Sequence, residues 1–403
     1  MTAARILARR AVAAVRTADR HIGRALGRAI VLVEARTPMN LAVLQPVYAP
    51  LLQDPRLDVR FTGLPRPDLQ RALEAAGIAD RFVPRASARW MRVDLYMNAD
   101  PWEAVRLRRV SRRLNFFHGV AGKYDLDRPA SLPLGLGRYD RIAFPNESRL
   151  TAYVAAGLAT QAQAALIGYP KVDVLARDRG DAAESARSLG LDVSRPTAIF
   201  APTFSTASVL HEAGEAIIET LLDMGCNVIA KLHDRSLDPD PRFNGGVDWT
   251  TRLHRFSADP AFLLARGGDS TPYVLASDLM VSDHSSIAFE FCVLDRPVIV
   301  FEVPRLASEA RINPEKIALL RSAAQVVHDQ QSLREAVDRS MANPSLGSAA
   351  RHHVADQVFY RPGTATGRAV TLAYELLELE PACDALNVPP ERACAKAGAW
   401  SAK

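Results

Sequence analysis

From Ala29 onward, short apolar runs alternate with stretches in which apolar residues recur at helical spacing. In the first half of the chain, the short runs predict strands and the periodic stretches predict helices. The predicted strands cover 29–35, 57–63, 92–98, 113–119 and 140–146, and the predicted helices lie near 40–53 and 67–76. Strands and helices that alternate in this way are typical of a parallel sheet with helices on both faces.

The second half repeats the alternation. Strands are predicted at 197–203, 226–232, 248–256, 278–283 and 297–302, and helices near 208–224, 271–276 and 286–294. We therefore expect an α/β protein with two Rossmann-like, doubly wound parallel-sheet domains. A polar, helix-compatible segment near 176–196 predicts the connection between them. The expected organisation is a basic helix at 1–28, an N-terminal domain at 29–178, a C-terminal domain at 179–345, helices at 346–380 and a flexible tail at 381–403.

The N-terminal segment 1–28 has a strongly basic character. At helical spacing its arginines gather on one side and most of its apolar residues on the other, with Ile6 as the exception. A helix of this kind can lie on an anionic membrane surface; the alternatives are a solvated helix packed on its own domain or a frayed terminus. The segment has a single acid, Asp19, and its arginines are Arg5, Arg9, Arg10, Arg16, Arg20, Arg24 and Arg28.

Composition narrows the class of protein. The chain has 403 residues, 48% of them hydrophobic, which is enough for two cores. Its net charge of +5 is too small to indicate general nucleic-acid binding. The four cysteines show no CxxC spacing, which favours a reducing compartment over disulfides or structural zinc. No apolar run reaches the roughly 18 residues of a membrane span, and no signal-peptide core is present, so we expect a cytosolic protein.

In doubly wound sheets, ligands bind beyond the carboxyl ends of the strands. One polar cluster follows the apolar residues of 113–117 and contains His118, Gly119, Gly122 and Lys123. The glycines allow close backbone approach, and an imidazole at a strand end can take a proton from an attacking hydroxyl. The alternative is an ordinary His-Gly turn.

A second cluster follows 228–230 and contains Lys231, His233, Asp234 and Arg235. Cations at a strand end can compensate the charge on a leaving phosphate. The alternative is a solvated polar loop.

The strongest cluster lies at 278–294. A strand ends in Ser282 and Asp283, and Ser285 and Ser286 begin a helix whose N–H groups and hydroxyls can bind phosphate. The alternative for the serines is a helix cap. Glu290 shares a helix face with Ser286 within an otherwise apolar run, and a ribose hydroxyl is its natural ligand.

A fourth position, Thr203 and Ser205 after the strand at 197–201, can contact phosphate or acceptor, although such residues are common in turns. The sequence contains no GxGxxG after the first strand and no Walker motif, which argues against NAD-type redox chemistry and P-loop hydrolysis. HExxH, GxSxG and paired metal-ligand spacings are also missing. We therefore expect no metal and no cofactor.

Five segments in register resemble the CDP-glycerol glycerophosphotransferase family, the teichoic-acid and capsule polymerases and primases, over roughly 110–370. They are FFHGVAGK, GYPKVDVL, IFAPTFS, AKLHDRS and LASDLMVSDHSSIAFEF. The resemblance implies the two-domain GT-B fold, with two Rossmann-like domains facing a cleft. Three departures concern the donor alcohol and the acceptor: His284 replaces the family's Tyr, Asp234 its Pro, and 120–122 its Thr-Pro-Leu.

The resemblance also implies roles for residues. His118 is the general base toward the acceptor hydroxyl, and His233 stabilises the donor diphosphate. Gly119 and Lys123 lie on the acceptor side. The donor and its phosphates are assigned to Lys231, Arg235, Thr203, Asp283, Ser285, Ser286 and Glu290, with Gly363 and Thr364 of the segment YRPGTATGR near the donor.

The function that follows is transfer of glycerol phosphate, or a similar phosphoalcohol, from CDP-glycerol to a hydroxyl of a surface polymer or its lipid-linked precursor, releasing CMP. The C-terminal domain is expected to hold the donor and the N-terminal domain to receive the acceptor. Expected partners are a CDP-alcohol, a lipid-linked or polymeric acceptor and an anionic membrane surface on the cytoplasmic face, with no nucleic acid. The alternatives are a GT-B glycosyltransferase or epimerase acting on a nucleotide sugar, and a non-catalytic envelope-assembly scaffold.

Overall fold

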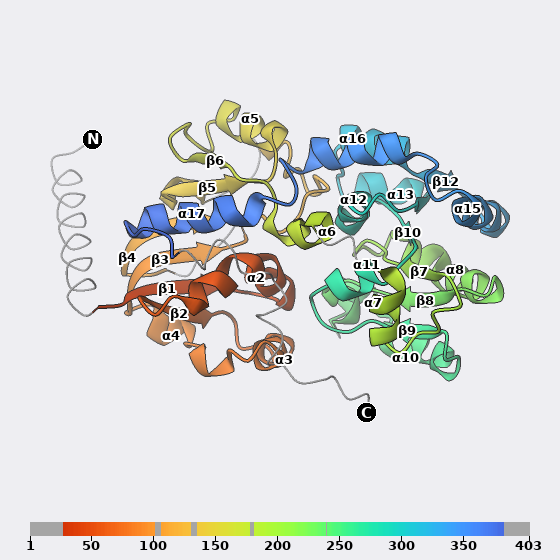
Figure 1. Ribbon diagram of the computed structural model, residues 1–403, viewed down its shortest axis with the longest axis horizontal. Coiled ribbons are helices and arrows are strands. Elements are labelled where there is room, and N and C mark those ends of the chain that lie inside the picture. Colours follow the sequence, from red (N-terminus) through yellow and green to blue (C-terminus); the bar gives the residue numbers. More distant parts are fainter. Residues whose placement is uncertain (1–26, 101–105, 130–134, 178–180, 239, 383–403) are drawn as a thin grey trace. The chain divides into compact units, whose positions relative to one another are not determined.

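The computed structural model describes residues 27–100, 106–129, 135–177, 181–238 and 240–382. The predicted N-terminal helix and the predicted tail therefore lie almost wholly outside the described residues. The chain forms two compact units (Figure 1). Unit 1 comprises Met1–His118, Pro133–Lys171 and Thr364–Lys403, and unit 2 comprises Gly119–Leu132 and Val172–Gly363.

These units differ from the predicted domains in three places, one of which is that residues 172–177 belong to unit 2. The segment after His118 belongs to unit 2, and the last helix belongs to unit 1. The chain therefore passes between the units at His118–Gly119, within the first predicted cluster. None of the helices in the described ranges combines the length and apolar character that a bilayer crossing requires.

Unit 1 contains a six-stranded sheet in the order β2-β1-β3-β4-β5-β6, in which all paired strands are parallel. Strand order reverses between β1 and β3, and the crevice beyond that point is where doubly wound sheets bind ligands. The elements of unit 1 are β1 (Ala29–Glu34), α2 (Pro38–Gln53), β2 (Leu57–Thr62), α3 (Pro67–Ala75), α4 (Arg85–Ala88), β3 (Arg92–Asn98), β4 (Arg109–Asn115), β5 (Arg141–Phe144), α5 (Glu147–Ala155), β6 (Ala164–Leu166) and α17 (Ala365–Leu377).

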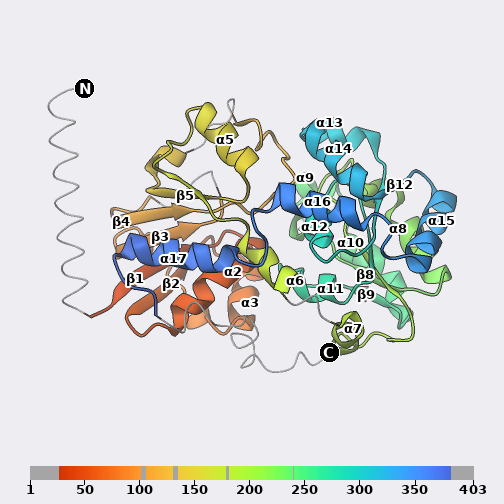
Figure 2. The same cartoon turned by 45° about the horizontal axis from the view of Figure 1, so that its top comes forward.

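The C-terminal helix α17 completes unit 1 by packing on β3, β4 and α2 (Figures 1 and 2). A buried polar contact fixes it, since the Tyr374 hydroxyl donates to Asp54 Oδ2 at 2.8 Å. Arg56 donates to the same carboxylate and holds the pKa of Asp54 at about 2, so that the carboxylate stays ionised. Residues more than 300 positions apart in the sequence thus close one domain.

Unit 2 contains a second six-stranded sheet in the order β12-β11-β10-β7-β8-β9, with all paired strands parallel. Strand order reverses between β7 and β10. The elements of unit 2 are α6 (Asp173–Arg177), α7 (Ala182–Ser188), β7 (Thr197–Phe200), α8 (Val209–Asp223), β8 (Asn227–Ala230), α9 (Pro241–Asn244), α10 (Trp249–Leu253), β9 (Phe262–Leu264), α11 (Thr271–Leu275), β10 (Leu279–Ser282), α12 (Ser286–Cys292), β11 (Val298–Phe301), α13 (Pro304–Glu309), α14 (Pro314–Ala323), β12 (Gln325–Val327), α15 (Gln330–Ala342) and α16 (Ser348–Val358).

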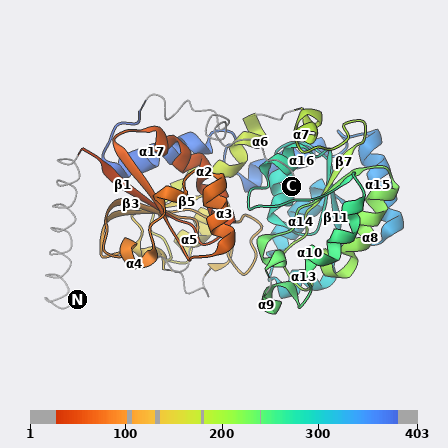
Figure 3. The same ribbon diagram turned by 90° about the horizontal axis from the view of Figure 1, so that it is seen from below.

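Two groups of helices cover this sheet. Helices α8 and α15 pack on each other, α8 over β7 and β8 and α15 over β11 and β12, and they lie side by side in Figures 1 and 3. Helices α12, α14 and α16 form the other group, with α12 against β10 and β11. The prediction of two doubly wound parallel-sheet domains is confirmed.

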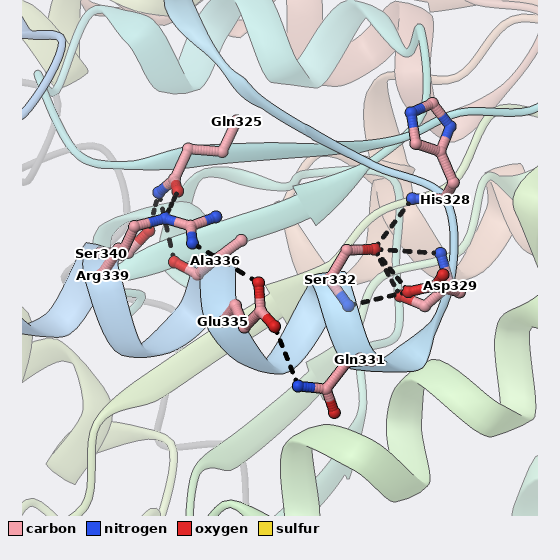
Figure 4. Close-up of polar contacts among 9 residues, drawn as sticks. All are labelled: Gln325, His328, Asp329, Gln331, Ser332, Glu335, Ala336, Arg339 and Ser340. Carbon is pink, nitrogen blue, oxygen red and sulfur yellow. Dashed lines mark hydrogen bonds and ion pairs between the residues drawn. The ribbon is translucent and has the colours of Figure 1, made fainter.

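The start of α15 shows how strongly local sequence fixes one of these helices (Figure 4). Asp329 Oδ1 accepts from the Ser332 N–H at 2.8 Å, and Ser332 Oγ accepts from the Asp329 N–H at 3.2 Å, which is a reciprocal capping box. At the far end, Arg339 donates to Gln325 Oε1 at 2.9 Å and Gln325 donates to Ser340 Oγ at 2.8 Å. These contacts tie α15 to β12.

The strand predicted at 248–256 is wrong. This segment is α10 followed by a 3-10 turn, His254–Ala258. Asp248 accepts from the Thr251 N–H at 3.1 Å and caps the helix, which buries Trp249 and Leu253 at i, i+4 spacing. The strand that pairs with β8 is β9, which begins at Phe262.

Candidate active site in two half-sites

The first half-site lies in unit 1, beyond the carboxyl ends of β3 and β4. His118 follows β4, and its Nδ1 lies 2.7 Å from Asp100 Oδ1 and 3.1 Å from the Ala99 carbonyl oxygen. Both neighbours are acceptors, so Nδ1 carries a proton that it donates to them. In the neutral imidazole Nε2 is then the basic nitrogen. The His118 side chain is 37% exposed, whereas the residue Asp100 is 7% exposed.

Two buried asparagines hold the Asp100 loop in place. Asn98 and Asn115, the last residues of β3 and β4, both donate to the Asp100 carbonyl oxygen, at 3.0 and 2.8 Å. Asn115 also donates to Asn98 Oδ1 at 2.9 Å. The two strand ends and the carboxylate therefore form one rigid support for the imidazole.

The charge state of Asp100 follows from its surroundings. Burial raises the pKa of this carboxyl, but the charge and hydrogen bond of His118, with Arg36 and Asn40, outweigh burial and bring the pKa below its ordinary value. Asp100 is thus an ionised orienting group at neutral pH. It is a candidate functional residue that the sequence analysis missed, although it lies two residues after the predicted strand 92–98, where the rule used for the other clusters would have found it.

The second half-site lies in unit 2, at the reversal between β7 and β10. Asp283 follows β10 and is fully buried. Its Oδ1 accepts from the Thr203 N–H at 2.8 Å and its Oδ2 from the Val209 N–H at 3.3 Å. Asp283, predicted as a donor ligand, is engaged with the backbone of the loop after β7 and the first turn of α8. It positions the loop that carries Thr203.

The segment after His118 is attached to this half-site. Ser286 Oγ accepts from the Ala121 N–H at 3.3 Å, and Lys123 Nζ donates to Thr203 Oγ1 at 2.8 Å. Gly119 lies against Ser286, since a Cβ added there would be 3.8 Å from its Oγ. Gly119 and Lys123, predicted on the acceptor side, are thus placed with the predicted phosphate-binding residues Thr203 and Ser286.

Lys123 has an unusual environment for a lysine. Desolvation lowers its pKa to about 8, and the Asp283 charge opposes this shift. The preceding residue, Gly122, has a backbone conformation that favours glycine, with a φ of +65°. A Cβ at this position would lie 2.2 Å from Asp127 Oδ2. The ammonium is therefore held, partly buried, beside the Thr203 hydroxyl.

His233, in the second cluster, follows β8 and is held differently from His118. Its Nδ1 accepts from the Arg235 N–H at 3.1 Å, so that His233 caps the short 3-10 turn Asp234–Leu237. In the neutral imidazole the proton is then on Nε2. Phe204 lies beside the ring, with centroids 5.5 Å apart, and the Arg235 guanidinium lies over Phe204 at 5.4 Å. Phe204 thus joins the loop after β7 to the loop after β8.

The other predicted donor ligands lie around the same strand ends. Lys231 is 6% exposed and donates to the Leu232 carbonyl oxygen at 3.1 Å. Ser285 is the cap residue of α12, but its side chain makes no capping bond there. Glu290 lies on α12 and is 4% exposed. Lys231 follows β8, and Ser285 and Glu290 lie at the start of α12 and within it; their roles as donor ligands stay predictions.

His284, the departure from the family pattern, is 2% exposed. Neither ring nitrogen makes a hydrogen bond within the described residues, and Nε2 lies 4.0 Å from Glu302 Oε1. Desolvation lowers its pKa and outweighs the charges of Asp283 and Glu302, so the ring is neutral at neutral pH.

Gly363 and Thr364 form the point where the chain leaves unit 2 for unit 1. Gly363 has φ +91°, which favours glycine, and its N–H donates to Asp173 Oδ1 at 2.8 Å. Arg177 donates to the Gly363 carbonyl oxygen at 2.5 Å, and Arg368 donates to Thr364 Oγ1 at 2.7 Å. These contacts attach the connection to α6 and α17.

Two doubly wound sheets, each with polar side chains beyond the strand ends, are the architecture of a GT-B transferase that uses a nucleotide-linked donor. The chain belongs to the CDP-glycerol:poly(glycerophosphate) glycerophosphotransferase family, whose model matches residues 124–370. The predicted family, enzyme class and CDP-glycerol-dependent transfer to a polymer are thereby confirmed at the level of the family.

Solved structures agree on the fold. The wall teichoic acid polymerase TagF, in a variant soaked with CDPG, is similar with a TM-score of 0.64 and 13% identity, over 90% of this chain and 94% of that one. MnaA of S. aureus, in a co-structure with UDP, has a TM-score of 0.52 and 12% identity, over 88% of this chain and 98% of that one. No curated protein matches the chain. At these identities the likeness establishes the GT-B fold.

Proposed function

We propose that His118 and His233 act in one phosphoryl transfer, His118 on the acceptor hydroxyl and His233 on the donor diphosphate. An acceptor hydroxyl oxygen attacks the glycerol-bearing phosphorus of CDP-glycerol in line, and the bond from that phosphorus to the bridging oxygen breaks. A new phosphodiester forms and CMP leaves. The hydroxyl proton passes to His118 Nε2, and His233 donates from Nε2 to the phosphate oxygens on which charge develops.

The observation that carries this assignment is the opposite hydrogen bonding of the two imidazoles. His118 Nδ1 donates to an ionised carboxylate, which makes Nε2 a base and stabilises the imidazolium that forms. His233 Nδ1 accepts from a backbone N–H, which leaves Nε2 as a donor. A base for the nucleophile and a donor for the diphosphate are the two proton roles that the reaction requires.

The phosphate groups are assigned to the residues at the β7–β10 reversal. Lys123 supplies an ammonium, and Thr203 and Ser286 supply hydroxyls that are already joined to the Lys123 segment by hydrogen bonds. Ser285, Lys231 and Arg235 are further ligands of the donor in this proposal. A desolvated cation interacts strongly with a phosphate because little water competes with it.

Glu290 is proposed to bind the ribose, because it is a buried carboxylate on α12 next to the phosphate hydroxyls. Gly363 and Thr364 are proposed to border the donor through their place in the connection between the units. The acceptor is proposed to be a lipid-linked or polymeric alcohol at the cytoplasmic membrane face, where the basic segment 1–28 would hold the enzyme. Its seven arginines and single acid support this location.

The test is CMP release by the purified full-length chain in the presence of a lipid-linked acceptor fraction. CDP-glycerol, CDP-ribitol and UDP-N-acetylglucosamine are offered as separate donors. We expect CMP release from CDP-glycerol and its loss in His118→Ala. Turnover of the UDP-sugar with no CMP release from either CDP-alcohol would replace this proposal by a nucleotide-sugar enzyme.

A further inference from the structure

A basic surface with an exposed tryptophan lies at the opposite edge of the unit 1 sheet from His118. Trp90 immediately precedes Met91 and β3, and it is 60% exposed, more than any other large hydrophobic residue in the described ranges. Two arginines lie over its ring: the guanidinium carbons of Arg89 and Arg108 lie 5.6 and 5.1 Å from the ring centroid. The Arg108 N–H also donates to the Arg89 carbonyl oxygen at 3.0 Å.

The strand starts gather these residues into one surface. Strands β1, β3 and β4 are neighbours and parallel, so the residues before them share one edge of the sheet. Arg92 donates to the Arg28 carbonyl oxygen at 3.2 Å, which joins the start of β3 to the start of β1. In Figure 1, β1 begins at the left, and α4, just before Trp90, lies below that end. We call Trp90 with Arg28, Arg89, Arg106 and Arg108 the amino-edge surface.

Among the described residues, the charge of the amino-edge surface is not compensated. All four of its arginines are exposed, and the described residues provide no acidic partner for any of their side chains. The acids near this edge are already engaged: Asp94 with Arg92 at 3.0 Å, and Asp140 with Arg112 at 3.5 Å. Exposed guanidinium groups around an indole favour a binding partner that is negatively charged and also offers an apolar region to the indole ring.

We propose that the amino-edge surface docks on an anionic lipid bilayer. Tryptophan is favoured at the bilayer interface, where the ring enters the acyl boundary and its N–H faces the headgroups. Arginines beside it are attracted by the negative potential of anionic lipids. The two cation–π contacts restrain the exposed ring, so less side-chain freedom is lost on docking.

The position of the surface distinguishes a bilayer from the polyanionic acceptor. His118 follows the carboxyl end of β4, whereas Trp90 precedes the start of β3, and β3 has 7 residues. At about 3.3 Å per residue, the two edges lie roughly 20 Å apart. The amino-edge surface is therefore too far from the imidazole to hold the reacting hydroxyl. A membrane contact needs no such proximity.

The test measures binding of the full-length chain to vesicles of phosphatidylcholine with and without phosphatidylglycerol, with no donor or acceptor present. The result is thus independent of glycerophosphate transfer. We expect Trp90→Ala and the double variant Arg89→Gln/Arg108→Gln each to weaken binding to anionic vesicles by about tenfold in low salt. Because every variant retains segment 1–28, any contribution of that segment is common to all of them.

Matched control variants show whether weaker vesicle binding is specific to the amino-edge surface or follows from the loss of any exposed apolar side chain or any two positive charges. Leu346, 53% exposed in unit 2, provides Leu346→Ala, and Arg71→Gln/Arg187→Gln removes two exposed charges elsewhere. We expect both controls to bind as wild type does. A second readout is the quenching of tryptophan fluorescence by lipids that are brominated in their acyl chains. This quenching should be stronger in wild type than in Trp90→Phe.

Two results would overturn the proposal. One is binding of Trp90→Ala and Arg89→Gln/Arg108→Gln to anionic vesicles within twofold of wild type. The other is binding of soluble polyphosphate as tight as that of vesicles and equally dependent on Trp90, which would make the surface a polyanion site. Thermal unfolding of each variant at the wild-type temperature establishes that the fold is retained, as the exposure of the three side chains predicts.

Discussion

The two histidines at the strand ends differ in what holds them. His118 in unit 1 is held by a buried, ionised carboxylate, and its Nδ1 donates. His233 in unit 2 is held by a backbone N–H, and its Nδ1 accepts. The same side chain therefore presents a basic Nε2 in one unit and a protonated Nε2 in the other. Local hydrogen bonding, rather than residue type, decides which proton role each histidine can take.

The largest effect is expected from His118→Ala. Removing the general base should lower kcat for glycerophosphate transfer by about 10³-fold, with little change in donor affinity. His353→Ala, an exposed histidine on α16, is the matched control and should keep wild-type activity. Initial rates of CMP release over a range of donor concentrations separate kcat from KM. A kcat within tenfold of wild type would remove His118 from the base role.

His233→Ala should have the next largest effect, about 10²-fold in kcat, because one donor to the developing phosphate charge is lost. His233→Gln sharpens the comparison, since the glutamine NH₂ can donate from near the position of Nε2. We expect this variant to recover part of the activity, whereas His118→Gln, which offers no base, should recover none. Equal recovery at both positions would contradict the assigned difference between the two imidazoles.

Asp100→Asn tests the carboxylate that orients His118. We expect kcat to fall by about 50-fold, because an amide supplies no negative charge to stabilise the imidazolium. The acid limb of the pH–rate profile should also move to lower pH, since the charge that favours protonated His118 is gone. Asp140→Asn, which alters a carboxylate directly before the start of β5 in the same sheet, is the control. A fall in rate without movement of the acid limb would mean that Asp100 acts only on folding.

The smallest effect is expected in the stability of the fold. It concerns the pH dependence of the free energy of unfolding that Lys123 causes, whereas the predictions for both histidines concern the rate of transfer. The pKa of Lys123 is lowered to about 8, so between about pH 8 and 10.5 the unfolded chain binds the proton that the folded chain has lost. The free energy of unfolding therefore gains a positive contribution as pH rises through this window. In Lys123→Met that contribution, on the order of 1 kcal/mol, should disappear. Urea unfolding of both proteins at pH 7.5 and pH 10 measures it, and identical pH slopes would contradict the buried position of the ammonium.

Much of the fold follows from the sequence because apolar runs and helical periodicity are local signals. The strands that begin at Ala29, Leu57 and Thr197 were predicted within a few residues. The segment 248–256 was not, because the cap by Asp248 and the i, i+4 burial of Trp249 and Leu253 depend on the packing of α10.

The candidate site was predicted less completely. Residues after apolar strands, such as His233 and Asp283, were found by the strand-end rule. The attachment of Lys123 to Thr203 was not, because residues 80 positions apart meet only in the folded unit. Asp283 illustrates a different limit: its position was correct, but its two backbone hydrogen bonds could not be read from its type.

The most direct test of the account is the tautomer of each histidine, measured by ¹⁵N NMR of the imidazole rings in the full-length protein at a pH where the rings are neutral. His118→Ala and His233→Ala identify the two sets of signals by their loss. The account predicts that His118 is protonated on Nδ1 and His233 on Nε2. The same tautomer at both positions, or the two reversed, would contradict the division into a base and a donor.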